Sequence, residues 1–586
     1  MNFLRNLLAS IIGTLFAFGI IFVMFFLLIT LLGNSEDTVS IKDNSILELQ
    51  LQRPISDYTG KNELDPFSGI FEQSQGLDEI LHAIEVAKTD GRIKGISINN
   101  NFILAGLAQT QAIRRALEDF KTSGKFIYAY ADFYMQSDYY LASVADSVFM
   151  NPVGVLDFKG LSTEVLYLKE LQEKSGVKIE VIRHGKYKSA VEPFLENNMS
   201  EANRAQLSAL LQSLWNSMVT DIAKTRSISE ENLNVIADTL GGRMPKFAKQ
   251  TGLIDEVLFY DEYEQKLAVA LNVTERGKIN YSTLDDYVKH SNKKTLRSGE
   301  NKIAVVFAQG EILYGEGGLD VIGQGIINEA LIKAREDDKV KAIVLRVNSP
   351  GGSALTSDII WREVELTKKI KPVIVSMGNV AASGGYYIAA GADRIFAEPT
   401  TITGSIGVFG TVPNLTELAD RIGVNAEQVG TNENAVEYSL FEPMQDSFKD
   451  QVQESIEDTY QTFLQRVSQG RNMTIAEVDS VAQGRVWSGT EAMGIGLVDE
   501  MGTLDDAIAY AAEKVSLSAY GIKKFPKYKS GFERLMEDLE GASVQVKENV
   551  LRNEIGTEAY SILKELKSIN ERKGIQARMP FALDIK

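Results

Sequence analysis

The chain matches itself at a constant offset of 247 residues, and this internal repeat limits the folds that it can adopt. Residues 83–96 align with residues 330–343 at that offset, and residues 252–256 correspond to residues 496–500 at a nearly equal one. A register held over so many residues indicates a duplicated domain. Because 586 residues exceed what one hydrophobic core organises, two copies of one domain are expected.

The pattern inside each copy predicts an α/β fold. In the second copy, apolar and β-branched runs at 341–347 and 372–376 flank a helical segment at 357–368. This alternation is typical of βα units. The continuous apolar stretches at 343–347 and 373–375 indicate strands of a sheet that is covered on both faces.

Residues 7–32 form an uncharged and mostly apolar run, which exceeds the roughly 20 residues that a membrane-spanning helix needs. Arg5 precedes the run, and Glu36 and Asp37 follow it. The positive-inside rule therefore places the short N-terminus in the cytoplasm and the remainder outside. A cleaved signal peptide is the alternative, but its apolar core is normally only about 7–15 residues long.

The expected organisation has four parts. They are an N-terminus and transmembrane anchor at 1–40, a first α/β repeat at 41–295, a second α/β repeat at 296–520 and a helical extension at 521–586. In the last part, a charged stretch with spaced apolar residues at 531–567 predicts helices that pack on a neighbour, with membrane contact as the alternative.

Composition excludes several classes of function. The 61 basic and 79 acidic side chains give a net charge of −18, which argues against a nucleic-acid partner. The absence of cysteine rules out disulfides, thiolate metal sites and cysteine nucleophiles. With only three histidines, a histidine-rich metal cluster is not expected, and neither a metal nor another cofactor is predicted.

The two copies differ where reactive chemistry is possible, and the first difference is a glycine pair. The second copy has Asn348-Ser-Pro-Gly-Gly-Ser353 after a strand, where the first has Asn101-Phe-Ile-Leu-Ala-Gly106. Two adjacent glycines let backbone N–H groups approach a ligand oxygen, as in an oxyanion hole. A simple strand-to-helix turn is the alternative.

The second difference is a serine among small residues. Ser383 lies in Gly378-Asn-Val-Ala-Ala-Ser-Gly-Gly385, and the first copy has Gln136 at the equivalent position. A helix that begins near Ser383 would favour negative charge there, and the Gly384 N–H could complete the hole begun by Gly351 or Gly352. A helix-capping serine is the alternative.

The third difference is a pair of lysines that only the first copy has. Lys186 and Lys188 lie in residues 185–194, whereas the equivalent residues 430–438 contain no lysine. A lysine can activate a serine only if burial keeps part of it neutral near pH 7. Either lysine could instead be a solvated surface charge, and spacing does not choose between them.

Together these motifs resemble the long, duplicated form of the signal peptide peptidase A (protease IV) family over nearly the whole chain. The resemblance rests on the anchor, the repeat, residues 187–194 and 348–353, Ala381-Ala-Ser-Gly-Gly-Tyr-Tyr387 and Thr403-Gly-Ser-Ile-Gly-Val408. It implies a fold like that of the Clp protease and crotonase superfamily.

The resemblance also assigns roles. It implies that Ser383 is the nucleophile, Lys188 the general base and Ser405 a residue that orients the lysine. The first repeat would then supply the base and the second the nucleophile. N–H groups of Gly352 and Gly384 would hold the oxyanion.

The implied setting is the bacterial cytoplasmic membrane, with a single-pass anchor and an extracytoplasmic catalytic part. The implied assembly is a bowl-shaped homotetramer, and the implied substrates are signal peptides and other apolar peptides. Three alternatives stay open. They are a histidine-based site that uses His184, acyl-CoA chemistry on a crotonase-like fold, and a catalytically silent membrane scaffold.

Overall fold

The computed structural model describes residues 40–60, 74–100, 102–294, 296–436, 438–528 and 576–579, together with residues 5, 6, 10, 12–21, 23 and 24. The expected transmembrane segment 7–32 falls partly outside these residues, and the expected C-terminal helices at 531–567 fall wholly outside them. Residues 12–21 are helical and expose apolar side chains such as Leu15 and Phe16. No helix among the described residues is long and apolar enough to cross a bilayer.

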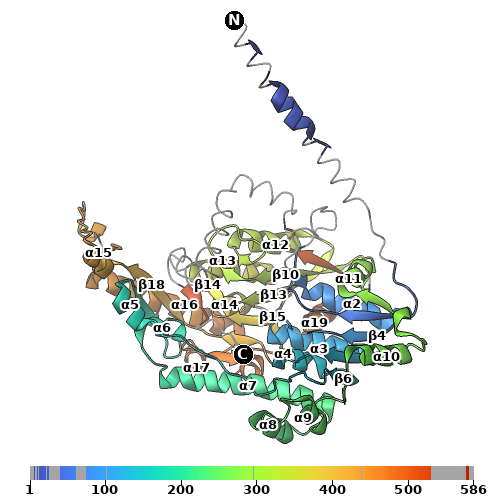
Figure 1. The fold of residues 1–586 in the computed structure, drawn as a ribbon. Helices are drawn as coiled ribbons and strands as arrows, with labels where there is room; N and C mark the ends of the chain where they lie inside the picture. Colours follow the sequence, from blue (N-terminus) through green and yellow to red (C-terminus); the bar gives the residue numbers. More distant parts are fainter. Residues whose placement is uncertain are drawn as a thin grey trace.

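The first repeat is built on a parallel sheet with the strand order β8-β6-β5-β4-β1-β9 (Figure 1). Its strands are β1 (Ser45–Leu49), β4 (Ile93–Ile98), β5 (Phe126–Ala131), β6 (Ser147–Met150), β8 (Glu256–Val257) and β9 (Asn280–Thr283).

The second repeat contains the same parallel arrangement, which confirms the duplicated α/β fold. β4, β5 and β6 each begin 247 residues before β13, β15 and β16. At the far end of β15 the second sheet is extended by β17 (Ile402–Gly404) and β19 (Val486–Ser488). The strands equivalent to the first sheet are β10 (Lys302–Gln309), β13 (Val340–Ser349), β15 (Val373–Ala382), β16 (Arg394–Ala397), β20 (Glu500–Met501) and β21 (Gly521–Phe525).

The helices repeat as well. In α2, apolar positions such as Ile80, Ala83 and Ile84 recur at helical spacing and are buried against the sheet. Acidic residues lie in its first turn and Lys88 in its last, which complements the helix dipole. The equivalent pairs are α2 (Leu77–Thr89) with α12 (Gln324–Glu336), α3 (Leu107–Lys121) with α13 (Ala354–Lys368), α4 (Gln136–Ala142) with α14 (Gly384–Ala389), α7 (Glu201–Arg226) with α16 (Asp446–Arg471), and α10 (Tyr260–Ala270) with α19 (Leu504–Lys514).

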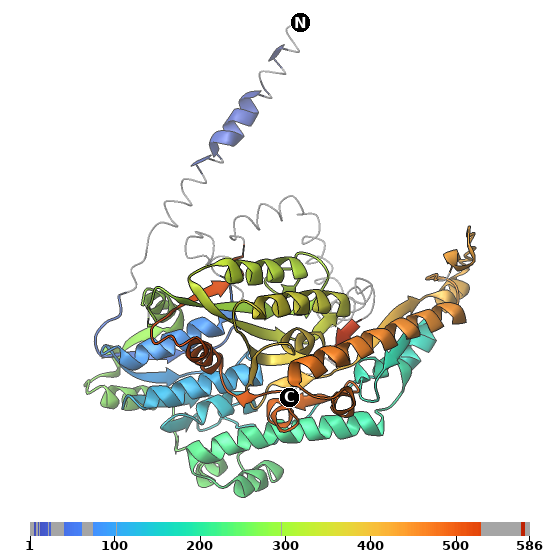
Figure 2. The same cartoon turned by 180° about the vertical axis from the view of Figure 1, so that it is seen from behind.

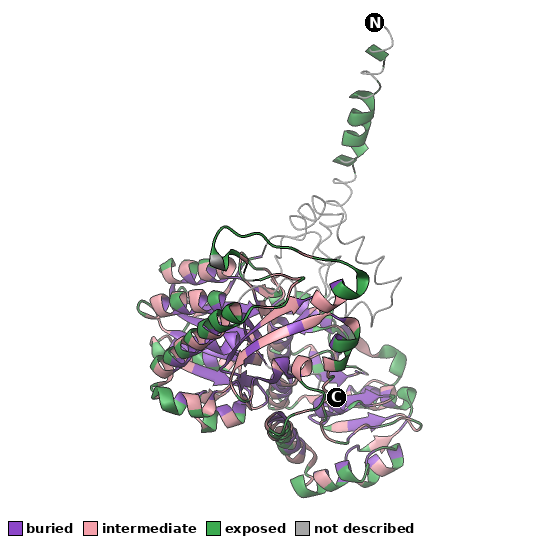
Figure 3. Cartoon of the chain, turned by 90° about the vertical axis from the view of Figure 1, so that its left-hand side faces the viewer, coloured by how far each residue is buried: buried purple, intermediate pink, exposed green. Residues whose placement is uncertain are grey.

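The central strand β13 shows why its sequence is apolar throughout. Ile343, Leu345 and Val347 face a core that includes residues of α12, α13 and α16, whereas Ala342 and Val344 face a second core that includes residues of α19. Alternate residues of a strand point to opposite faces, so a sheet covered on both faces needs apolar residues at every position. Figure 3 shows the buried residues concentrated on the strands. The predicted strands at 343–347 and 373–375 are confirmed.

One expected boundary is wrong. Residues 521–525 were expected to begin a helical extension, but they form the edge strand β21, which pairs with β10 just as β9 pairs with β1. The second repeat therefore ends as the first does. The polar pair Lys523 and Lys524 makes this short edge strand hard to recognise from its sequence.

A third sheet joins the two repeats and matters most for the site. β7 (Lys178–His184) of the first repeat pairs antiparallel with β18 (Val408–Asn414) of the second, from Val408 opposite His184 to Asn414 opposite Lys178. This pairing carries the chain that follows His184 onto the second repeat (Figure 2). The sheet has the order β12-β11-β14-β22-β18-β7, and its remaining strands are β11 (Glu311–Ile312), β12 (Val321–Ile322), β14 (Gly351–Ser353) and β22 (Gln576–Arg578).

Candidate active site

Ser383 lies at the junction between β15 and α14, and its backbone conformation is unusual. Its φ of 55° and ψ of −115° belong to a region that side chains rarely adopt, at a cost of roughly 1–3 kcal/mol. Its N–H donates to the Gly404 carbonyl at 2.8 Å. Its side chain is fully buried and forms no helix-capping hydrogen bond, so the capping alternative is wrong.

Lys188 follows strand β7 and is also fully buried. Its Nζ lies 2.8 Å from Ser383 Oγ, 3.0 Å from Ser405 Oγ and 3.0 Å from the Ser405 carbonyl oxygen. Burial lowers the pKa of Lys188 well below its usual range. A neutral amine at this distance can accept the proton of the serine hydroxyl.

Lys186, the other lysine of the motif, lies elsewhere. It is exposed, and its ammonium group sits 5.5 Å from the centre of the Tyr187 ring. The structure therefore brings Lys188 to Ser383 and leaves Lys186 at the surface.

Ser405 is held by the backbone around it. Its φ is 51°, its N–H donates to the Arg485 carbonyl at 2.6 Å, and its side chain is buried. Because Lys188 Nζ bonds both its hydroxyl and its carbonyl, Ser405 restricts where the amine can point.

The glycine pair borders the same site. Gly351 and Gly352 have φ values of +98° and +152°, which favour glycine. A Cβ placed on Gly351 would lie 2.7 Å from the Gly384 nitrogen, and a Cβ placed on Gly384 would lie 3.2 Å from the Gly352 nitrogen. The amide groups of Gly352 and Gly384 therefore border one small space, as an oxyanion hole requires. This segment also pairs as strand β14, so it is more than a simple turn.

His184, the candidate for a histidine-based site, is bonded elsewhere. Its Nδ1 lies 2.6 Å from Glu457 Oε1, and its ring stacks on Tyr460 with 4.0 Å between the ring centres. The partner of Ser383 Oγ is Lys188. The histidine alternative therefore has no support in this geometry.

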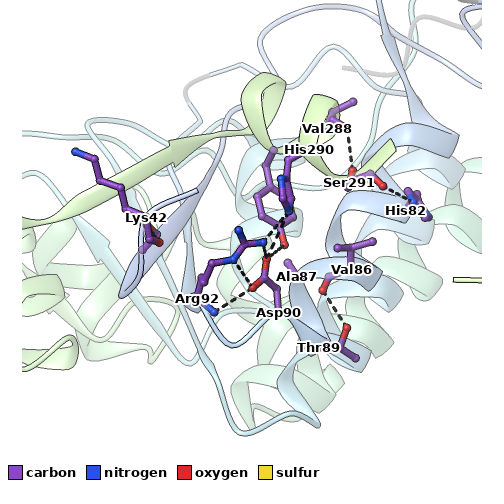
Figure 4. Close-up of polar contacts among 12 residues, drawn as sticks. Lys42, His82, Val86, Ala87, Thr89, Asp90, Arg92, Val288, His290 and Ser291 are labelled. Atoms are coloured by element: carbon purple, nitrogen blue, oxygen red, sulfur yellow. Dashed lines mark hydrogen bonds and ion pairs between the residues drawn. The ribbon is translucent and has the colours of Figure 1, made fainter. Parts of the chain in front are cut away.

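The other two histidines belong to a polar cluster between α2 and α11 (Leu284–Asn292) (Figure 4). His82 Nε2 lies 3.0 Å from the Ser291 carbonyl oxygen. His290 Nε2 lies 2.7 Å from Arg92, which also forms an ion pair with Asp90. In the part of the chain that the structure describes, no group of three or more His, Asp or Glu side chains is arranged to hold a metal ion.

Gly484, which no sequence motif pointed to, packs directly on the lysine. Gly484 has a φ of +79°, and a Cβ placed on it would lie 2.7 Å from Lys188 Cβ. Both copies have a Gly-Arg pair in this region, Gly242-Arg243 and Gly484-Arg485, so Gly484 is not among the differences between the copies. A glycine shared by both copies next to a loop was the available signal.

Comparison with known families agrees with the duplication. The model of peptidase family S49 matches residues 119–274 and again residues 365–518. The Clp protease family model matches residues 298–408, which include Gly352 and Ser383.

Individual relatives are similar over most of their length. The chain is 41% identical to Protease 4 of Haemophilus influenzae, over 75% of this chain and 73% of that protein. It is 37% identical to Protease 4 of Salmonella typhi, over 80% and 77%. It is 33% identical to the chloroplastic serine protease SPPA of Arabidopsis thaliana, over 81% and 70%. With family matches in both repeats and relatives of this similarity, the chain belongs to peptidase family S49 and is a serine peptidase.

Proposed function

We propose that this chain is an endopeptidase with a Ser-Lys dyad, in which Ser383 is the nucleophile and Lys188 the general base. The observation that carries the proposal is the 2.8 Å distance between Lys188 Nζ and Ser383 Oγ, with both side chains fully buried. The first repeat supplies the base through the chain after β7, and the second supplies the nucleophile.

In this mechanism neutral Lys188 takes the Ser383 proton while Oγ attacks the scissile carbonyl carbon. The N–H groups of Gly352 and Gly384 stabilise the oxyanion. The lysine then gives its proton to the leaving amine, and the acyl-enzyme remains. The same amine activates the water that hydrolyses the ester. Ser405 keeps the amine directed at Ser383.

The remaining alternatives explain the site less well. Among the residues that the structure describes, buried Lys188 has no carboxylate partner, and burying such a group costs stability unless the amine is neutral. A membrane scaffold gives no reason for that cost. Acyl-CoA chemistry would use the oxyanion hole but gives no role to the contact between Lys188 and Ser383.

The test is hydrolysis of a synthetic signal peptide by the detergent-solubilised full chain, beside Ser383→Ala and Lys188→Ala proteins of verified fold. We expect both variants to lose activity by about 10³-fold or more, because removing one member of such a catalytic unit disables it. Substantial turnover by either folded variant would refute its assigned role.

We further propose that the substrates are signal peptides and other apolar peptides, in line with the resemblance of the motifs. A matched peptide of equal length with its apolar core replaced by serine and asparagine checks this proposal. Cleavage of both peptides at equal rates would contradict a preference for apolar substrates.

The apolar run at 7–32 supports a membrane anchor with the catalytic part on the outer face of a bacterial cytoplasmic membrane. Carbonate extraction of membranes tests the anchor, which should hold the full chain but not a chain that begins at residue 41. We also propose a homotetramer, and the mass of the detergent-solubilised protein in solution tests it.

A further inference from the structure

Residues 483–485, here called the bridging segment, contact the chain that leads to the proposed base. The Gln483 carbonyl accepts a hydrogen bond from the Tyr187 N–H at 2.9 Å. Tyr187 is the residue before Lys188, and Gly484 packs directly on Lys188 itself. The bridging segment therefore restricts the path of the backbone from which the amine projects.

The bridging segment also holds the residue that restricts the amine. The Gly484 N–H donates to the Ile406 carbonyl at 2.8 Å, and the Arg485 carbonyl accepts from the Ser405 N–H at 2.6 Å. Ser405 in turn bonds Lys188 Nζ through its hydroxyl and its carbonyl oxygen. The bridging segment therefore connects the backbone at the lysine with the serine that the lysine contacts.

Gln483, the first residue of the bridging segment, has an unfavourable backbone conformation. Its φ of 52° lies in the left-handed region, which side chains other than glycine rarely adopt. Such a conformation persists only where the surrounding structure holds it. A surface cavity of about 450 Å³ borders Gln483, and its lining includes Tyr460 and Asp479. Close packing therefore does not enclose Gln483 on that side.

Hydrogen bonds from two helices hold Gln483 instead. The Gln483 N–H donates to Tyr460 Oη of α16 at 3.3 Å. The Gln483 side-chain nitrogen Nε2 lies 2.6 Å from Oδ1 of Asp479, which belongs to α17 (Ile475–Val481). The Tyr460 hydroxyl donates to the same carboxylate oxygen. Both the backbone and the side chain of Gln483 are thus fixed by one tyrosine and one aspartate.

The first repeat has the same bond between helices without the link to the loop. α7 and α16 begin 245 residues apart, and at that offset Trp215 is equivalent to Tyr460 and Asn234 to Asp479. Trp215 Nε1 donates to Asn234 Oδ1 at 2.7 Å. Among the hydrogen bonds of the described residues, those that join this pair to the loop at the Gly-Arg pair belong to the second repeat. That loop is the one that contacts the lysine.

We propose that Tyr460 and Asp479 are positioning residues of the peptidase. By holding Gln483 in its left-handed conformation, they keep the bridging segment against Lys188 and Ser405. They act through this segment and not on the substrate. The inference rests on the proposed Ser-Lys function and adds the residues that keep the amine aligned with the serine hydroxyl.

The first test is peptide hydrolysis by the detergent-solubilised full chain, with kcat and KM measured for Tyr460→Phe and Tyr139→Phe proteins of verified fold. Tyr460→Phe keeps the ring that stacks on His184 and removes the acceptor of the Gln483 N–H. We expect kcat to fall about 10-fold and KM to stay within about twofold of wild type, because the amine is misplaced while the substrate contacts remain. Tyr139→Phe is the matched control. It removes a buried hydroxyl that donates to the Leu253 carbonyl in the first repeat, and both constants should stay near those of wild type.

The second test compares Asp479→Asn with Asp479→Ala. Asparagine keeps an oxygen that can accept both hydrogen bonds, as Asn234 accepts one in the first repeat. We therefore expect kcat of Asp479→Asn to stay within about twofold of wild type, and kcat of Asp479→Ala to fall about 10-fold or more. Equal losses in the two variants would show that the negative charge acts instead of the hydrogen bonds, and they would overturn the inference. If Asp479→Ala does not fold, Tyr460→Phe and Asp479→Asn decide the question.

A Ser383→Ala protein in the same assay separates this inference from the proposed function. If Ser383→Ala is as active as wild type, the peptidase assignment fails and the inference fails with it. If Ser383→Ala is inactive while Tyr460→Phe and Tyr139→Phe have equal kcat values, the inference alone is overturned. A rise in KM without a fall in kcat would place Tyr460 in substrate binding, and it would also overturn the inference.

Discussion

The two repeats place different side chains at equivalent positions. These positions are the junction between β5 and α4 in the first repeat and the junction between β15 and α14 in the second. In the first repeat this residue is Gln136, whose Oε1 accepts from the N–H groups of Lys159 and Gly160 and whose Nε2 donates to the Gly160 carbonyl. In the second repeat it is Ser383, whose hydroxyl contacts Lys188. One copy uses the position to hold a loop, and the other places the hydroxyl of the proposed nucleophile there.

The surroundings of Gln136 and Ser383 also differ between the two repeats. Gly160 corresponds to Gly407, and a Cβ placed on Gly407 would lie 3.3 Å from Lys188 Cδ. The region that the glutamine side chain spans in the first repeat is thus filled in the second by a lysine from the other repeat. A duplicated scaffold can therefore form an asymmetric site when one copy contributes a segment, here β7 and the residues after it, that packs on the other copy.

Lys188→Arg should produce the largest effect. Arginine keeps the positive charge and a long side chain but cannot lose its proton, so we expect kcat to fall by about 10³-fold or more. Peptide hydrolysis measures the loss. Lys186→Arg is the matched control and should stay within twofold of wild type, since Lys186 is exposed. An active Lys188→Arg protein would contradict the proposal that the first repeat supplies the general base and the second the nucleophile.

Gly484→Ala should have the next largest effect. The new Cβ would press on Lys188 and displace the amine from Ser383, and we expect activity to fall by about 10- to 100-fold, as small misplacements of catalytic groups cause. Gly423→Ala is the control, because its φ of +78° carries the same backbone penalty with nothing within 4 Å of the Cβ position. Equal activities of the two variants would argue that Gly484 does not position the lysine.

Gln136→Ala should affect stability rather than catalysis. It leaves the Gly160 loop with unsatisfied backbone groups, and we expect the free energy of unfolding to fall by about 1–3 kcal/mol. Urea unfolding measures this change, and peptide hydrolysis should stay near that of wild type. Ser383→Ala should show the reverse. If Gln136→Ala abolished hydrolysis instead, the first junction would be part of the catalytic machinery.

The last expected effect, the smallest within one pH unit, is a pH dependence of stability that Lys188 causes. Its folded-state pKa lies well below 10.5 because of burial, so between these two pKa values the unfolded chain binds one more proton than the folded chain. Stability therefore rises with pH across that window, by about 1.4 kcal/mol per pH unit. Lys188→Met removes this contribution.

The measurement is urea unfolding of wild type and Lys188→Met between about pH 8 and pH 10, where contributions from other groups cancel in the difference. The stability of wild type relative to the variant should increase with pH. A constant difference would mean that Lys188 titrates in the folded protein as it does in the unfolded chain.

The sequence by itself determined the architecture and the kinds of residue that carry the chemistry. The repeat follows from comparison of the chain with itself, and the βα alternation and the strands at 343–347 and 373–375 follow from local periodicity, which depends only on neighbours along the chain. The difference between Gln136 and Ser383 is visible from alignment of the copies alone. Spacing left both Lys186 and Lys188 as candidates because they lie two positions apart in one motif, and the family resemblance selected Lys188.

Only the tertiary structure decided how Lys188 reaches the serine and left Lys186 at the surface. Lys188 and Ser383 are 195 residues apart, and their contact depends on the pairing of β7 with β18 across the two repeats. The place of Gly484 against the lysine, the edge strand β21 and the insertion of β22 beside Gly352 have the same origin. Such contacts arise from the register of distant segments and from burial, neither of which is encoded in the pattern of any single segment.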